Sequence, residues 1–203
     1  MTDELSILNA ALSHLGEERQ LDDLTPDVPS REQRVLQALL PLTRDAMLRK
    51  HPWLCAERRL TVTREPLDAD ADWAFTNLFL LPTDMLRLWH ADTDCAWQVG
   101  SHAVRAPDGV VTSRRTVLFS NSAGPVKIRI VERVAYEHLD ALLADAMGYE
   151  LAARAAGPLQ ADKALAKSLK GDAREALAMA VTAETSEFND EIVIPRGRFL
   201  SSR

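Results

Sequence analysis

The sequence is poor in the features that mark secreted and membrane proteins. Its only cysteines are Cys55 and Cys95, too few for a disulfide framework, and we expect both to be reduced. Asp3 and Glu4 stand where a signal peptide would carry positive charge, and no apolar run approaches the ~20 residues that span a bilayer. We therefore expect a soluble protein with no membrane partner.

Catalytic signatures are also scarce. The sequence has no glycine-rich phosphate loop, no G-x-S-x-G elbow, no H-E-x-x-H and no paired C-x-x-C. His90, Cys95 and His102 come nearest to a set of metal ligands, but their spacing matches no standard zinc pattern. Ser101 beside His102 lacks a third member for a catalytic triad. We predict that the protein is not an enzyme and has no catalytic residue, metal or cofactor.

Basic residues are few where acidic residues are many. The formal net charge is -6. Residues 1–30 hold seven acidic side chains against Arg19 alone, so this segment accounts for the whole net charge and the remainder is formally neutral. DNA-binding modules normally concentrate Lys and Arg on one face to displace phosphate counterions. The charge distribution therefore disfavours a DNA-binding protein.

Leucine spacing predicts two helices at the start of the chain, over about residues 2–16 and 30–50. Thr2 can cap the first helix, and Gly16 is expected to end it. Ser30 followed by Gln33 has the capping-box pattern, so the second helix should begin there. Pro41 lies inside this helix and has no N–H to donate, which predicts a kink or a break.

The most regular helical pattern spans residues 139–187. Apolar residues in its first half share one helix face: Leu139, Leu142, Leu143, Ala146, Met147 and Leu151. Gly157 suits a left-handed turn that ends a helix, and Pro158 can open the next one. We therefore predict two helices joined at Gly157-Pro158 and packed antiparallel, with an alanine-rich stripe on the second helix that permits close approach.

Between the first two expected helices and the last two, β-branched residues and an alternation of apolar and polar residues replace the helical spacing. Short strands are expected at 59–63, 85–89, 97–99, 103–105, 116–119 and 126–131, with turns that include Gly100. Four tryptophans fall in or beside this region and are expected to form its core or its contact with the helices: Trp53, Trp73, Trp89 and Trp97.

The predicted fold class is α+β, mainly α. An antiparallel helical bundle or hairpin core is expected from residues 1–56 and 134–187, with a small antiparallel β unit inserted at 57–133. Residues 188–203 are expected to form an extended C-terminal tail. The tail has no helical period, but it is too apolar for simple disorder. It either docks onto another chain or packs back onto its own subunit.

The opening of the chain resembles the tail tubular protein A family of short-tailed phages. In that family a first helix ends in a Gly-Glu turn, which matches Leu15-Gly16-Glu17. An acidic connection then leads to a long helix that ends at a tryptophan beginning a strand, here Trp53.

Later segments resemble the same family in the same order. A Leu-Pro-x-Asp motif is represented by Leu81-Pro82-Thr83-Asp84, and a charged strand that leads into the next helix by Val131-Glu132-Arg133. An alanine-rich helix, a Gly-Pro step and a long final helix complete the match. The resemblance covers nearly the whole chain, although each motif taken alone is short.

The resemblance implies a structural virion protein, the subunit of a head-to-tail adaptor. Such proteins form a dodecameric ring beneath the portal protein, receive the tail nozzle or tail tube on the other face, and leave a central channel through which DNA passes. The implied location is the neck of the virion, after assembly in the host cytoplasm. Head-completion proteins of long-tailed phages and gene-transfer agents share the helical-hairpin plan, so the type of particle stays open.

Two sets of contact residues follow as hypotheses. The first, on the C-terminal tail, would bind the portal or a neighbouring subunit: Ile192, Val193, Ile194, Arg196, Arg198, Phe199 and Leu200. The second, in loops 67–77 and 106–115, would face the tail and includes Asp108, Arg114 and Arg115. The alternatives are another phage structural or scaffolding subunit, a helical DNA-binding regulator, and a small enzyme that uses His90, Cys95 and His102.

Overall fold

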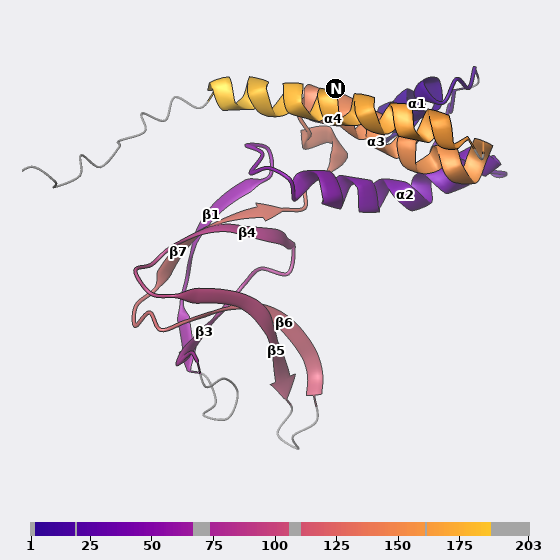
Figure 1. Ribbon diagram of the computed structural model, residues 1–203. Helices are drawn as coiled ribbons and strands as arrows, with labels where there is room; N and C mark the ends of the chain where they lie inside the picture. The colour runs from indigo at the N-terminus through magenta and orange to yellow at the C-terminus, as the bar shows by residue number, and fades with distance from the viewer. Residues whose placement is uncertain (1–2, 19, 67–73, 106–110, 161, 188–203) are drawn as a thin grey trace, which may run out of the picture.

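The computed structural model describes residues 3–18, 20–66, 74–105, 111–160 and 162–187. It is of mixed α+β class, with helices at one end of the molecule and strands at the other (Figure 1). In chain order the elements are α1 (Glu4–His14), α2 (Arg31–Leu48), β1 (Glu57–Val62), β2 (Arg64–Pro66), β3 (Asn77–Leu80), β4 (Met85–Asp92), β5 (Trp97–Arg105), β6 (Val111–Ser120), β7 (Val126–Glu132), the 3₁₀ turn η1 (Tyr136–His138), α3 (Ala141–Gln160) and α4 (Lys163–Glu187).

Local signals explain the limits of α1. Asp3, rather than the predicted Thr2, is its N-cap: the Asp3 carboxylate accepts from Ser6 N at 2.7 Å, and Asp3 N donates to Ser6 Oγ at 3.0 Å. An acidic side chain at this place also complements the positive end of the helix dipole. Gly16 follows the helix with φ of +79°, which confirms the predicted stop.

The start of α2 is confirmed, but of the two predicted consequences of its proline, a kink or a break, the break does not occur. Ser30 Oγ accepts from Gln33 N at 3.1 Å, while the Gln33 side chain donates to the carbonyls of Asp23 and Leu24 instead of closing a capping box. The helix runs unbroken through Pro41. Buried apolar side chains lie on both sides of the proline, and their packing outweighs the loss of one hydrogen bond: Leu36, Leu40, Met47 and Leu48.

The predicted break at Gly157-Pro158 is also wrong. Both residues lie inside α3, which continues to Gln160. The helix persists because Ala155 and Ala156 are fully buried beside these residues. The signal that sequence reasoning missed is Asp162, whose Oδ1 accepts from Ala164 N at 2.8 Å and from Leu165 N at 3.0 Å and so caps α4.

The larger apolar cluster gathers residues from α1, α2, α3 and α4. Small side chains allow α3 and α4 to approach closely, as the alanine-rich stripe predicted: Ala152, Ala155 and Ala156 on α3, and Ala173, Ala176 and Ala180 on α4. Leu142, which was expected on the buried face of α3, is instead 45% exposed. It lies in the first turn of the helix, where Asp140 accepts from its backbone N–H.

The strands form two antiparallel sheets, ordered β1-β7-β4 and β2-β3-β6-β5. Only Thr63 separates β1 from β2, so the chain passes there from one sheet to the other. A second apolar cluster combines residues of both sheets, among them Val62, Phe79, Leu118 and Ile128. The region therefore has a core of its own.

The tryptophans behave differently from one another. Trp53 is fully buried and belongs to the helical cluster, as predicted. Trp89 and Trp97 are 36% and 39% exposed, so neither is a core residue, and Trp73 lies outside the described residues. Arg87 covers the Trp89 ring, with its guanidinium carbon 4.5 Å from the ring centroid.

An ion pair joins the helices to the end of the strand region. Arg133, just after β7, donates from Nη2 to Asp45 Oδ2 of α2 at 2.5 Å. Burial raises the pKa of Asp45, but hydrogen bonds and charge from Arg133 and Arg44 outweigh it and hold the pKa below its ordinary value. The pair therefore stabilises the fold only while Asp45 is ionised.

Replacing the α4 cap tests the observed helix boundary. Asp162→Ala removes the acceptor for two backbone N–H groups, and we expect the free energy of unfolding to fall by about 1 kcal/mol. Asp162→Asn keeps a side-chain oxygen and should lose much less. Denaturant titration followed by circular dichroism measures both. Equal stability of the two variants would contradict the assigned cap.

Replacing Arg133 should give a pH-dependent loss of stability. Arg133→Gln is expected to cost about 0.5–1 kcal/mol at neutral pH, since the pair is partly exposed. Because the folded-state pKa of Asp45 is lowered, the stabilisation is complete above the ordinary aspartate range near pH 4 and is lost as the pH falls below it. Thermal unfolding at several pH values should therefore show the two proteins converging in acid; a constant difference would contradict this origin.

Candidate protein interface

Most of the sequence-predicted contact residues cannot be placed. The tail residues lie outside the described part of the chain: Ile192, Val193, Ile194, Arg196, Arg198, Phe199 and Leu200. Asp108 lies outside it as well. Arg114 and Arg115 are described, and both are exposed. They belong to strand β6, so the expectation that 106–115 is one loop is wrong for residues 111–115.

The strand that pairs with β6 is also longer than predicted. Gly100 was expected to form a turn, but β5 runs through it without interruption. The glycine is needed for a close approach, because a Cβ at Gly100 would lie 2.7 Å from Cε2 of Phe119 on β6. The ring of Phe119 stacks on Phe75, with centroids 6.2 Å apart. A packing contact between neighbouring strands therefore explains a residue that sequence reasoning assigned to a turn.

The β5–β6 arm, defined here as residues 101–105 and 111–116, extends beyond the rest of its sheet. β3 pairs with β6 only from Val117 to Ser120. Side chains at 111–116 are all exposed, whereas Val117 and Leu118 are fully buried. Figure 1 shows the end of β5 and the start of β6 at the side of the sheet that is far from the helices. Within the described residues, the arm is therefore a two-stranded extension of the sheet whose side chains at 111–116 are exposed.

The two arginines of the arm do not form one basic patch. Arg114 lies opposite Ala103 and Arg115 opposite His102 in the β5–β6 register. Because neighbouring residues of a strand point to opposite faces, the two guanidinium groups serve different faces of the arm. One acidic partner surface on one face would meet only one of them.

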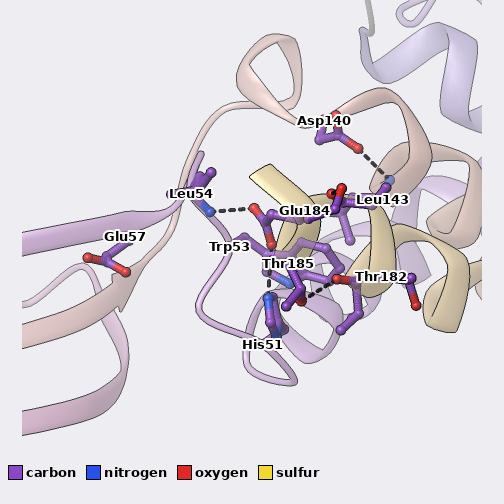
Figure 2. A network of polar contacts seen from close by, with 12 residues as sticks. His51, Trp53, Leu54, Glu57, Asp140, Leu143, Thr182, Glu184 and Thr185 are labelled. Carbon is purple, nitrogen blue, oxygen red and sulfur yellow. Dashed lines mark hydrogen bonds and ion pairs between the residues drawn. The ribbon is translucent and has the colours of Figure 1, made fainter. Parts of the chain in front are cut away.

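A polar cluster fixes the last turn of α4 against the junction of α2 and β1 (Figure 2). Glu184 Oε2 lies 3.0 Å from His51 Nε2, and Glu184 Oε1 accepts from Leu54 N at 2.6 Å. The Glu184 side chain is only 10% exposed. Burial raises the pKa of Glu184 and lowers that of His51, so desolvation disfavours the charged form of each.

Aromatic packing completes this cluster. The His51 ring meets Trp53 edge-on with centroids 4.9 Å apart, and Trp53 Nε1 donates to Met47 O at 3.2 Å. Beside it lies a pocket of about 220 Å³, whose lining includes the exposed side chains of Leu54 and Leu142. The arrangement fixes the last turn of α4, which ends at Glu187.

Sequence reasoning missed the pairing of His51 with Glu184. His51 was assigned a capping or surface role, and Glu184 was not singled out. The residues lie far apart in the chain, and no short motif connects them. The available signal is weak: an acidic side chain in an α4 segment otherwise rich in alanine and threonine, and a histidine directly before Pro52-Trp53.

The remaining chemical candidates lie apart. His90 is paired with Arg129 between β4 and β7, whereas His102 is paired with Arg115 between β5 and β6, so the imidazoles belong to different sheets. Within the described ranges, no group of three or more His, Cys, Asp or Glu is placed to hold a metal ion. Cys55 and Cys95 are free thiols. Burial raises the pKa of Cys55, which disfavours the reactive thiolate.

In comparisons with known proteins, no family model matches this chain and no curated protein is significantly similar to it. None of the helices that the structure describes combines the length and apolar character needed to cross a membrane.

Replacing Glu184 should loosen the end of α4. Glu184→Ala leaves Leu54 N without its acceptor, and we expect a loss of about 1 kcal/mol in the free energy of unfolding. Glu184→Gln keeps an acceptor oxygen and should lose less. Glu187→Ala, at an exposed position one turn away, is the matched control and should be close to neutral. Hydrogen exchange of the last turn of α4 measures the local effect; equal exchange in all three variants would contradict the role of Glu184.

Proposed function

We propose that this chain is the subunit of a head-to-tail adaptor of a tailed bacteriophage. In this proposal a ring of copies, twelve in number, joins the portal protein to the tail nozzle or tail tube. The ring lies in the neck of the virion and forms part of the channel through which DNA leaves. The four helices supply the helical bundle or hairpin core of the family, and the strands supply its inserted β unit.

The proposal is carried by one observation: two segments that resemble the family, far apart in sequence, meet in space. Arg133 N donates to Asp84 O at 3.0 Å, which joins the charged strand end to the Leu-Pro-x-Asp motif. Arg58 of β1 contacts both segments, at 3.5 Å from Asp84 Oδ2 and 2.7 Å from Glu132 Oε2. Motifs matched only by their order thus form one structural unit, as expected of a shared architecture.

The other matched residues also lie at junctions. Gly16, in the Leu-Gly-Glu turn, takes the positive φ that ends α1, and Glu17 N donates back to Leu12 O at 3.0 Å. Trp53 is buried between the end of α2 and the start of β1. These positions lie where the chain changes direction, which supports the resemblance.

The distribution of surfaces suits a ring subunit. Such a subunit must bury surface against two identical neighbours and against two different rings. The helices and the β5–β6 arm lie at opposite ends of the molecule (Figure 1). In our proposal the arm, with Arg114 and Arg115, faces the tail nozzle or tail tube of the virion, and residues 188–203 bind the portal or a neighbouring subunit. The acidic segment 1–30 faces a basic ring or weakly repels DNA in the channel.

Co-sedimentation with portal rings of the same particle tests the function. The full chain should add a stoichiometric ring to the portal, visible by negative-stain imaging. A chain ending at Glu187 should lose ring assembly, because it lacks the proposed docking segment. A chain carrying Arg115→Glu, on the face of the arm opposite to Arg114, is the control: it should still join the portal but attach the tail component poorly.

Two outcomes would contradict this proposal. Absence of any association between the full chain and portal rings would remove the adaptor function itself. Undiminished assembly by the chain that ends at Glu187 would remove the role of the C-terminal tail while leaving the adaptor function in place.

A further inference from the structure

The two sheets present four edges, and three of them are protected. An edge strand offers unpaired N–H and C=O groups to other chains, and natural proteins protect such edges with charged residues, proline or short length. Charged residues or proline occur in three edge strands: Glu57, Arg58 and Arg59 in β1, Arg87 and Asp92 in β4, and Arg64, Glu65 and Pro66 in β2. β2 is also only three residues long.

The fourth edge, β5, has none of these protections along most of its length. It spans nine residues, and no Asp, Glu, Lys, Arg or Pro occurs from Trp97 to Val104. In the described part of the chain its only hydrogen-bonded neighbour is β6. The side chains of Trp97 and Val99 are 39% and 38% exposed. This strand therefore has the character of an edge that another strand covers.

The exposed residues of β5 continue an apolar face that is buried elsewhere. Val99 lies opposite Leu118, which is fully buried in the cluster between the two sheets. Leu118 in turn lies opposite Phe79 of β3, also fully buried. Cross-strand partners share one face of a sheet. An added strand with apolar side chains on this face would extend the buried apolar surface beyond Val99.

We propose that residues 190–196 of a second copy of this chain add as a strand to the edge of β5. This inference rests on the proposed function and specifies the neighbour contact of the C-terminal tail. The occupant is indicated by its chemistry: Ile192-Val193-Ile194 is an uncharged run of β-branched residues, which favour strands, and it follows the end of α4 at Glu187. Strand addition joins backbones by hydrogen bonds, while alternate side chains give specificity.

An antiparallel addition with Ile194 beside Val99 satisfies both apolar packing and charge. In this register Asp190 lies beside Ala103, on the face that carries Arg114. The acidic group therefore comes to the side of the arm where one guanidinium is exposed. Pro195, which cannot donate, falls on the new outer edge, where proline is tolerated.

A contact between the C-terminal tail of one copy and β5 of the next copy is heterologous. The donated segment and the accepting edge are different surfaces of one chain, so each copy can donate once and accept once. Such heterologous contacts generate rings when the rotation between copies closes. Pairing of β5 with β5 would instead give closed dimers.

A complementation experiment distinguishes these arrangements. Val99→Lys places a charge on the accepting edge and leaves the tail intact, whereas Ile194→Asp alters the tail and leaves the edge intact. Sedimentation velocity of the full chain should show self-association that each variant alone weakens by about tenfold or more, because a charge would be buried in the contact. An equimolar mixture of the variants should recover one-to-one pairs, since one intact tail can meet one intact edge.

Thr61→Lys is the matched control, at an exposed position on the already charged edge β1. It should associate as the unaltered chain does. Circular dichroism should show that all variants remain folded, since Val99 is partly exposed and residue 194 lies beyond the last helix.

Several results would overturn the inference. Normal association of Ile194→Asp with loss in Val99→Lys would indicate pairing of β5 with β5. Failure of the mixture to recover pairs would indicate a tail that docks on its own copy. A full chain that stays monomeric at every concentration would also overturn the inference. A Val99→Lys chain that still forms stoichiometric rings on the portal would overturn the inference and leave the adaptor function in place. Recovery of pairs in the mixture without any portal binding would support the inference and contradict the adaptor function.

Discussion

The pairing of β1 with β7 is the constraint on which the rest of the structure depends. These strands are the first and last of the region between α2 and α3, and they are antiparallel neighbours with Glu57 opposite Val131. Glu132 N also donates to Ala56 O at 2.9 Å. The chain therefore leaves the helices and returns to them at one place. All intervening strands can extend away from the helices without separating α2 from α3.

Electrostatic contacts strengthen this pairing from within. Glu57, whose side chain is 6% exposed, binds Arg129 Nη2 at 2.6 Å across the two strands. Burial alone would raise the pKa of Glu57, but Arg129 and Arg59 hold it below the ordinary value. A buried carboxylate is tolerable only with such partners. The same junction receives Glu184 from the last turn of α4, so the end of this helix is fixed to the base of the strand region.

Short-range signals in the sequence predicted much of the secondary structure, whereas tertiary packing decided the rest. Gly16 and Ser30 act through their immediate neighbours, and both were predicted correctly. Gly157, Pro158 and Gly100 were assigned breaks because their local preferences favour turns; buried alanines keep the helix intact in one case, and the Phe119 ring requires glycine in the other. Local preference is a weak guide wherever a neighbouring element supplies more packing energy.

The candidate interface was less predictable for the same physical reason. Arg114 and Arg115 look like one basic pair in sequence, yet a strand sends them to opposite faces. The pairing of His51 with Glu184 depends on how α4 packs against the junction, which no local pattern encodes. The sequence does show which residues of a strand carry charge. The absence of charge from Trp97 to Val104 gained a meaning only when the topology placed β5 at the edge of its sheet.

The protein therefore separates two tasks. Charged side chains on β1, β4 and β2 keep three edges from pairing with other chains, while β5 keeps backbone groups and two partly exposed apolar side chains free of such protection. A monomer that needed no partner would gain from a charge between Trp97 and Val104 of β5 as well, because exposed edges promote aggregation. In our proposal, the uncharged run from Trp97 to Val104 is covered by residues 192–194 of a neighbouring copy when the subunits assemble, so the native state includes the neighbours.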